Sequence, residues 1–380
     1  MEEHLMKKYI IAVLLLLSML LSGCASPEKA DGESEALPAV SDTLPFLEAG
    51  ENILAASAGM ELGSTVFTVN GEPVTAGEYL YWLAYSADYL MDNYFYYTYT
   101  HPVLTDEMAD GVSYAEYIRE AATERTVLFS IIRALASQYS IELDGADIEE
   151  IDFQYNAAVE KMGDESKLLS DLARMGLDKE SYYSLMKDQL LYNKLKQSVS
   201  KATCALHPDS ETIVAWCKER KYITADHILI KTTDIPDNDT FALEQKRTKA
   251  QSLLDDLLAS TDIEAVFTEF ADEYSEDIGH ETYPVGYTFS PGTMEAAFED
   301  AAYAVQPGEL FPELVQTSYG YHIIFRKQLN INDPGMLADY LDSLLSDACA
   351  EAKLDFCEAY ESISAVGFYD NLTTYRQNME

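Results

Sequence analysis

The spacing of apolar residues changes once along this chain, and the change limits what the chain can fold into. From residue 75 to about residue 200, apolar side chains recur at a spacing of roughly 3.6 residues, which predicts a series of amphipathic helices. Beyond residue 222, two runs rich in β-branched residues, 223–231 and 320–327, predict strands with helices between them. A helical part beside a mixed part favours the α+β class, and 380 residues are too many for one ordinary domain.

Local signals mark the ends of several of these elements. The Asn70-Gly71 pair predicts a tight hairpin turn, and Thr75 followed by Glu78 predicts a capping box at the start of a helix. A last helix is expected from about residue 335 to about residue 360. Other helices of the mixed part are expected at residues 241–258, 263–274 and 295–303.

Residues 1–23 have the pattern of a bacterial secretory signal peptide, with translation starting at Met1 or at Met6. Their apolar run, residues 9–21, is shorter than the roughly 20 residues that a membrane-spanning helix needs. The run ends in Leu21-Ser22-Gly23-Cys24, which resembles the lipobox of bacterial lipoproteins. That resemblance implies cleavage before Cys24 and lipidation of its sulfur, whereas an uncleaved anchor with an incidental cysteine is the alternative.

The chain is strongly acidic, because 25 Lys and Arg stand against 66 Asp and Glu, a formal net charge of −41. This charge opposes attraction to phosphate backbones and so excludes nucleic-acid binding. It also means that attachment to an anionic membrane needs a specific anchor. Residues 24–63 are rich in Glu, Ser, Ala, Pro and Gly, and they predict an acidic flexible tether.

Four cysteines lie beyond Cys24, and their spacing fits no zinc or redox motif. We therefore predict neither a metal site nor a cofactor. Cys349 and Cys357 are expected on one helix, about 12 Å apart along its axis, which is too far for a disulfide between them. Free thiols are favoured, and a disulfide joining Cys204 or Cys217 to this later pair is the alternative.

Aromatic residues are concentrated early in the helical part, where eight tyrosines lie between Tyr79 and Tyr99. Tyrosine offers a broad apolar surface with a polar tip, so this helix can be interpreted as a surface that holds unfolded polypeptide. The alternative, a helix packed into the core of its own domain, is favoured.

Five sequence blocks stand out in the mixed part, at residues 225–230, 273–277, 290–299, 305–309 and 319–324. In this order they resemble the motifs of the parvulin family of peptidyl-prolyl isomerases. They span about 107 residues, from residue 221 to residue 327. The Asn-Gly opening and the helices after it resemble, more loosely, the chaperone part of exported PrsA/SurA-type foldases. The five blocks are Ala225-Asp226-His227-Ile228-Leu229-Ile230, Glu273-Tyr274-Ser275-Glu276-Asp277, Ser290-Pro291-Gly292-Thr293-Met294-Glu295-Ala296-Ala297-Phe298-Glu299, Val305-Gln306-Pro307-Gly308-Glu309 and Tyr319-Gly320-Tyr321-His322-Ile323-Ile324.

The resemblance implies a set of site residues. His227 and His322 match a pair of histidines that hydrogen-bond to each other, and Asp277 matches the acidic or thiol residue beside them. The family's usual Gly-Gly-Asp-Leu-Gly stretch is replaced here by Thr282-Tyr283-Pro284-Val285-Gly286-Tyr287. The residues matching the substrate-binding positions are Val285, Met294, Phe298, Thr317 and Tyr319.

The chemistry of these residue types suits rotation about an X-Pro bond. That rotation faces a barrier of roughly 18–20 kcal/mol and requires no metal or covalent step. An apolar slot for the proline ring, with hydrogen-bonding groups that favour the twisted amide, would lower the barrier. The alternatives are that the two histidines are ordinary core residues and that Asp277 only caps its loop.

Together these features predict a small parvulin domain, an antiparallel sheet wrapped by helices at residues 221–327, inserted in a mainly α-helical chaperone module. The module would comprise residues 64–220 and be completed by residues 328–380. The expected function is isomerisation of X-Pro bonds in unfolded, newly exported polypeptides, at a bacterial cell membrane and on its extracytoplasmic side. A homodimer is an arrangement that the resemblance allows. The rival hypothesis is a holdase that binds polypeptide through the same fold without turnover.

Overall fold

The computed structural model describes residue 47 and residues 50–236 and 238–379, so the predicted signal peptide and Cys24 lie outside the described residues. The described chain divides into two compact units. The first unit combines the residues up to Ser198 with those from Asp342 onward, and the second unit is Val199–Leu341. No helix in these described stretches is both long enough and apolar enough to cross a membrane.

The first unit opens with a short helix and a hairpin. Asn70 and Gly71 both adopt positive φ angles, 54° and 91°, as the predicted tight turn requires. A third strand lies on the other side of the first, giving the order β2-β1-β7 with antiparallel pairing. The elements are α2 (Ile53–Ala58), β1 (Thr65–Val69), β2 (Glu72–Thr75) and β7 (Leu354–Phe356).

The prediction of a flexible tether over residues 24–63 is wrong for the last part of this range. Residues 53–58 form helix α2, in which Ile53 and Leu54 are almost fully buried. Leu54 packs so closely on Gly176 that a Cβ there would lie 2.2 Å from the leucine side chain. Two apolar anchors in an otherwise polar stretch are enough to fix this segment on the helices.

Long helices make up most of the first unit, and the predicted capping box of Thr75 and Glu78 is present. The core interpretation of the aromatic helix holds for its first half, where Tyr79 and Tyr81 are buried. It fails for the last turns, where Tyr96 and Tyr97 are 73% and 78% exposed. The helices are α3 (Ala76–Thr98), α4 (Tyr114–Gln138), α5 (Gly145–Met162), α6 (Glu165–Arg174), α7 (Lys179–Val199), α13 (Glu358–Glu361) and α14 (Ala365–Asn378).

The prediction of one closing helix to about residue 360 is wrong. Helix α12 (Pro334–Ala350) ends ten residues earlier, and strand β7 follows it and pairs with β1. Phe356 of that strand packs on Phe67, with ring centroids 5.4 Å apart. Cys349 and Cys357 therefore do not share a helix, and none of the four described cysteines forms a disulfide.

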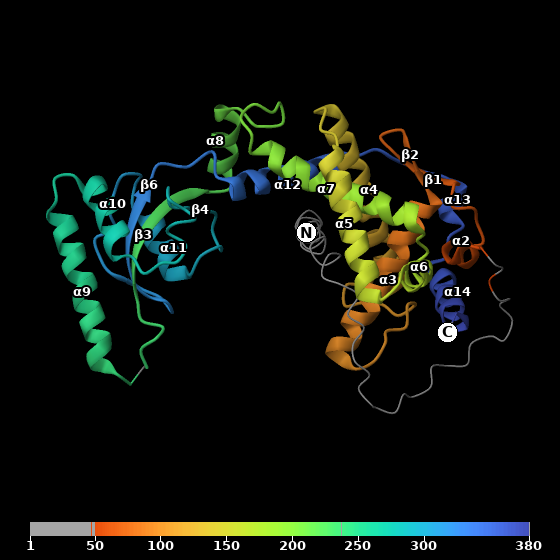
Figure 1. Cartoon of the computed structure of the whole chain (residues 1–380), viewed down its shortest axis with the longest axis horizontal. Helices are drawn as coiled ribbons and strands as arrows, with labels where there is room; N and C mark the ends of the chain where they lie inside the picture. Colours follow the sequence, from red (N-terminus) through yellow and green to blue (C-terminus); the bar gives the residue numbers. More distant parts are fainter. Residues whose placement is uncertain (1–46, 48–49, 237, 380) are drawn as a thin grey trace. The chain divides into compact units, whose positions relative to one another are not determined.

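The second unit is built on a four-stranded antiparallel sheet with the order β4-β3-β6-β5 (Figure 1). The two long central strands and helix α10 have the predicted bounds, and the predicted α+β class is confirmed. The elements are α8 (Ser210–Glu219), β3 (Ile223–Lys231), α9 (Thr240–Ala259), α10 (Ile263–Tyr274), β4 (Tyr287–Phe289), α11 (Ala296–Ala304), β5 (Val315–Gln316) and β6 (Gly320–Lys327).

Alternation along β3 and β6 sends side chains to two different cores. On one face Ile228, Ile230 and Ile323 pack with residues of helices α9 and α10. On the other face Ile223 and Ile324 pack with residues of helix α11. His227 and His322 have the same parity as this second set, so both histidines lie on the α11 face of the sheet.

Candidate active site

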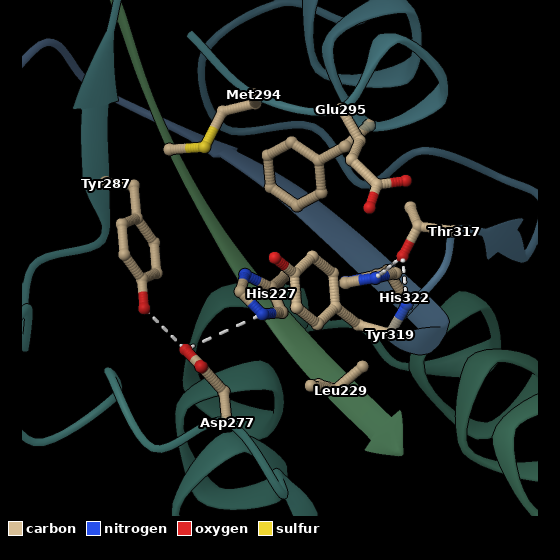
Figure 2. A pocket seen from close by; sticks show the side chains of 10 residues that line it. His227, Leu229, Asp277, Tyr287, Met294, Glu295, Thr317, Tyr319 and His322 are labelled. Carbon is tan, nitrogen blue, oxygen red and sulfur yellow. Dashed lines mark hydrogen bonds and ion pairs between the residues drawn. The ribbon is translucent and has the colours of Figure 1, made fainter. Parts of the chain in front are cut away.

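A cavity of about 320 Å³ opens on the α11 face of the second unit's sheet (Figure 2). It combines two imidazoles and two carboxylates with an apolar wall, and seven of the eight predicted catalytic and substrate-binding residues line it. The lining residues are His227, Leu229, Asp277, Tyr287, Met294, Glu295, Phe298, Thr317, Tyr319 and His322.

The two histidines come from the paired central strands. His227 lies opposite Ile324 and His322 lies opposite Leu229, so the histidines are diagonal neighbours on one face. Their ring centroids are 5.0 Å apart, at an interplanar angle of 58°. Both side chains are buried, with 9% and 5% of their surface exposed.

The expected hydrogen bond between the two imidazoles is not formed. The Nδ1 atoms of His227 and His322 are buried and have no hydrogen-bond partner among the described residues. Nε2 of His322 shares a 2.7 Å hydrogen bond with the hydroxyl of Thr317. Nε2 of His227 lies 3.6 Å from Oδ2 of Asp277. The diagonal register holds the rings near each other but directs each toward a different polar partner.

Burial keeps both imidazoles uncharged. Loss of water lowers the pKa of His227, against a smaller opposing effect of the Asp277 carboxylate. Burial and the neighbouring His227 lower the pKa of His322 to about 3. At neutral pH the cavity therefore presents two neutral rings, each able to donate from one nitrogen and accept at the other.

Asp277 is positioned by a segment that lies beside β3, beyond the residues of β3 that pair with β4. The Glu276 backbone N–H donates to the Leu229 carbonyl at 2.8 Å, and the Lys231 backbone N–H donates to a Glu276 carboxylate oxygen at 2.7 Å. One oxygen of Asp277, Oδ1, accepts from the Gly279 backbone N–H at 3.1 Å and so caps the loop. The other oxygen, Oδ2, points toward His227, so Asp277 both caps the loop and faces the cavity.

Phe298 and Met294 form the apolar wall. The Phe298 ring stands nearly perpendicular to both imidazoles, with centroids 5.3 Å from His227 and 5.6 Å from His322. The loop that carries Met294 is fixed by the Glu299 carboxylate, which accepts from three consecutive backbone N–H groups, those of residues 292–294. A proline ring entering here would contact aromatic and thioether surface on one side and imidazole on the other.

The structure leaves Val285 out of the cavity, contrary to its predicted placement. Its side chain is 52% exposed, in the middle of a turn closed by a 2.9 Å hydrogen bond from the Gly286 N–H to the Tyr283 carbonyl. Gly286 has φ 92°, and a Cβ there would lie 2.8 Å from the Ala225 carbonyl oxygen. This close passage against β3 turns the preceding residue outward.

Three lining residues were not predicted from the sequence: Leu229, Tyr287 and Glu295. Leu229 is two residues beyond His227 on the same strand, so strand alternation could have identified it. Glu295 lies at the start of α11, where its carboxylate accepts hydrogen bonds from the Ser318 hydroxyl and backbone N–H. Tyr287 lies in the stretch that departs from the family pattern, and no sequence signal connects its hydroxyl with Asp277.

No group of three or more His, Cys, Asp or Glu side chains in the described part of the chain is arranged to hold a metal ion. The cavity has instead the features needed to bind an amide and change its electron distribution. Its neutral imidazoles and the Thr317 hydroxyl provide hydrogen-bonding groups, and its apolar wall excludes water.

Comparison with known proteins agrees with this chemistry. Residues 213–327 match the family described as "PPIC-type PPIASE domain". The second unit thus contains a domain of the peptidyl-prolyl isomerase type, which covers the sheet, helices α9 to α11 and every residue that lines the cavity.

Curated relatives extend beyond this domain. A protein named "Foldase protein PrsA 2" from Listeria monocytogenes serotype 4b is 31% identical over 182 residues, which are 46% of this chain and 52% of that protein. "Foldase protein PrsA 1" from Lactobacillus johnsonii is 26% identical over 218 residues, 56% of this chain and 63% of the relative. The chain thus spans about half to two thirds of the length of these relatives.

Among solved structures, the crystal structure of the peptidylprolyl isomerase PrsA from Bacillus anthracis matches at 19% identity. The match covers 67% of this chain and 96% of that one, with a TM-score of 0.24. A TM-score this low adds nothing to the domain match.

Proposed function

We propose that the second unit accelerates cis/trans isomerisation of X-Pro bonds in unfolded, exported polypeptides. The observation that carries the proposal is the cavity itself, in which two buried neutral histidines and Asp277 lie beside an apolar wall of Met294 and Phe298. The domain match and the foldase names of the relatives support it.

The geometry suggests how such catalysis would work. Phe298 and Met294 hold the proline ring, and the twisting amide comes to lie over the two imidazoles. When the C–N bond rotates, amide resonance is lost, so the carbonyl oxygen becomes less negative and the nitrogen gains a lone pair. A dry site whose donors and acceptors fit the twisted amide better than the planar one lowers the barrier without a covalent step.

The remaining catalytic and binding roles follow the same logic. Asp277 sets the electrostatic environment of His227, and Thr317 orients His322 through their shared hydrogen bond. Tyr319 is 56% exposed at the rim, where its ring can cover the peptide on either side of the proline.

The first unit would hold polypeptide while the second unit acts on it. The far end of α3 and the loop after it carry exposed apolar and aromatic side chains, which favour contact with extended, partly apolar segments. These side chains are Phe95, Tyr96, Tyr97, Tyr99 and Val103. The proposed organisation is a chaperone module, residues 64–220 with 328–380, that carries the isomerase domain 221–327 as an insertion. The discontinuous first unit supports an insertion, and the compact second unit, Val199–Leu341, extends beyond the proposed isomerase domain at both ends.

The N-terminal sequence supports an extracytoplasmic, membrane-anchored location. Residues 1–23 would be removed, and Cys24 would carry the lipid that anchors the chain to the bacterial cell membrane. With a net charge of −41, the lipid rather than electrostatic attraction would retain the protein at the membrane. A homodimer remains part of this proposal.

The second candidate function is a holdase that binds polypeptide in the same cavity without turnover. The observation that favours it is the missing hydrogen bond between the imidazoles, together with the altered stretch 282–287 beside the site.

A refolding assay separates the two functions. The client is a protein whose slow refolding phase is limited by one X-Pro bond, and the full chain is compared with its His322→Ala variant. An isomerase increases the slow rate in proportion to its concentration, and the substitution reduces this effect by about tenfold or more. A holdase lowers aggregation of the client equally well with either variant and leaves the slow rate unchanged, which would refute catalysis.

A further inference from the structure

One oxygen of Asp277 is shared by two side chains. The Tyr287 hydroxyl lies 2.6 Å from Oδ2, the same oxygen that lies 3.6 Å from Nε2 of His227 (Figure 2). An ionised carboxylate only accepts hydrogen bonds, so the tyrosine is the donor. The distance is in the range of charge-assisted O–H···O⁻ bonds, which are stronger than neutral ones.

The Tyr287 ring packs against two neighbouring rings. It lies almost parallel to the His227 imidazole, at 23° with centroids 5.6 Å apart, and the Tyr283 ring packs on it at 4.6 Å. Burial, followed by the contact with Asp277, raises the pKa of the Tyr287 hydroxyl. The hydroxyl therefore stays protonated and remains a donor throughout the physiological pH range.

Gly279 provides the space in which the hydroxyl lies. A Cβ at this position would lie 1.9 Å from the Tyr287 hydroxyl oxygen and 3.4 Å from Oδ2 of Asp277. Gly279 does not adopt a positive φ angle. A glycine is needed here because it leaves space for the hydroxyl, and not because of an unusual backbone conformation. Its backbone N–H also donates to Oδ1 of Asp277, so Gly279 and Tyr287 fix the two oxygens of one carboxylate.

We propose that Tyr287 is a positioning residue of the isomerase site, which acts through Asp277 on His227 and depends on the absence of a side chain at Gly279. The inference rests on the proposed function. Without the hydroxyl, the carboxylate keeps only its contact with the loop N–H and can rotate away from Nε2 of His227. With the hydroxyl, the charge is held on one side of the imidazole and favours a proton on Nε2, leaving Nδ1 as an acceptor.

The test compares single and double substitutions in the full chain. Tyr287→Phe keeps the ring and removes only the hydroxyl. Tyr283→Phe is the matched control, because it removes a hydroxyl from the adjacent ring of the same loop. We expect Tyr287→Phe to lower kcat for a prolyl peptide by about tenfold, the equivalent of one charge-assisted hydrogen bond. The KM of Tyr287→Phe should stay within about twofold of that of the parent chain, because the apolar wall is unchanged. Tyr283→Phe should have the same kcat and KM as the parent chain.

A double substitution tests the link with Gly279. Gly279→Ala places a methyl group against the hydroxyl and should lower kcat at least as much as Tyr287→Phe. Once Tyr287→Phe has removed the hydroxyl, the nearest atom to this methyl group is Cζ of the ring at 3.1 Å, instead of the oxygen at 1.9 Å. Gly279→Ala should therefore lower kcat by a smaller factor in the Tyr287→Phe background than in the parent chain. The inference would be overturned if the factors by which the two substitutions lower kcat simply multiply in the double variant. It would also be overturned if Tyr287→Phe is as active as Tyr283→Phe.

A spectroscopic measurement keeps this test separate from the fate of the proposed function. The ¹⁵N resonances of the His227 imidazole report which nitrogen carries the proton, whether or not the chain turns over peptide. Tyr287→Phe should move both resonances toward the values of an imidazole that exchanges between tautomers, and Tyr283→Phe should not. If the parent chain lacks isomerase activity, the proposed function fails, and unchanged His227 resonances in Tyr287→Phe would by themselves refute the positioning role.

Discussion

Burial has the largest effect on the protonation of His227 and His322, and it outweighs the effect of the carboxylates nearby. Protonating either ring would place a charge in a buried position, and among the described residues neither Nδ1 atom has an acceptor for the added proton. The site therefore works with neutral imidazoles, and the carboxylates of Asp277 and Asp226 both act electrostatically on His227. This arrangement suits a reaction in which no proton is transferred.

The lowered pKa of His322 has a consequence for stability. Its folded-state pKa of about 3 lies below the unfolded value of about 6.5, so between these pH values the unfolded chain binds more protons than the folded chain. The second unit should lose up to about 1.4 kcal/mol of stability for each pH unit below about 6.5. Above that pH the two states bind equal numbers of protons, and the effect vanishes.

Urea unfolding at pH 7 and pH 5 measures this effect. The chain has two tryptophans, of which Trp216 lies in the second unit and Trp82 in the first. A Trp82→Phe background thus leaves one fluorescence probe for the second unit. His322→Gln should reduce the loss of stability between the two pH values, and equal losses with and without this substitution would contradict the account.

At the scale of residues, the sequence predicted the site residues that belong to the ordered motif blocks. It did not predict Tyr287, whose role depends on its neighbours in the folded chain. His227, Asp277 and His322 were identified because the blocks fix both their type and their order. The role of Tyr287 depends on the reach of its hydroxyl past Gly279, which is a property of the folded loop. Val285 was misplaced because a positive-φ turn at Gly286 directs it outward.

At the scale of elements, local signals determined most of what could be predicted. The Asn-Gly turn, the Thr75 capping box and helix α10 each carry their own sequence mark, and each is present in the structure. Strand β7 has no such local signal in its sequence. Its three residues form a strand only because they pair with β1, which lies near the start of the first unit. No window of local sequence contains that partner.

Aromatic packing around Phe67 joins the two ends of the first unit. The Phe67 ring is fully buried and contacts Tyr79 of α3, Phe356 of β7 and Tyr360 of α13, with centroids 5.9, 5.4 and 5.8 Å away. This cluster attaches the returning C-terminal segment to the N-terminal hairpin.

Phe67→Ala should therefore destabilise the first unit by about 3–5 kcal/mol, the usual cost of emptying a packed aromatic site. Unfolding is followed by Trp82 fluorescence in a Trp216→Phe background. Tyr97→Ala is the control, because this side chain is 78% exposed and its loss should change stability by no more than about 0.5 kcal/mol. Similar losses of unfolding free energy for the two substitutions would argue against the role of the cluster in attaching the C-terminal segment to the hairpin.

At the scale of the whole molecule, the chain enters the second unit after Ser198 and returns to the first unit at Asp342. The second unit is thus a single continuous segment between two pieces of the first unit. This arrangement allows a holding surface and an isomerase site to be carried on one chain while each keeps its own core. The strongly acidic composition opposes attraction to phosphate backbones, and the proposed function relies instead on apolar and peptide contacts with its polypeptide substrates.

The most direct test of the account is cis/trans exchange in a short X-Pro peptide, measured by NMR exchange spectroscopy with the full chain added in substoichiometric amount. The account predicts exchange cross-peaks between the cis and trans resonances on a timescale far shorter than the tens of seconds of the uncatalysed process. His322→Ala should remove most of this enhancement without unfolding the second unit. Peptide resonances that broaden on binding while the exchange rate stays at its uncatalysed value would contradict the isomerase function.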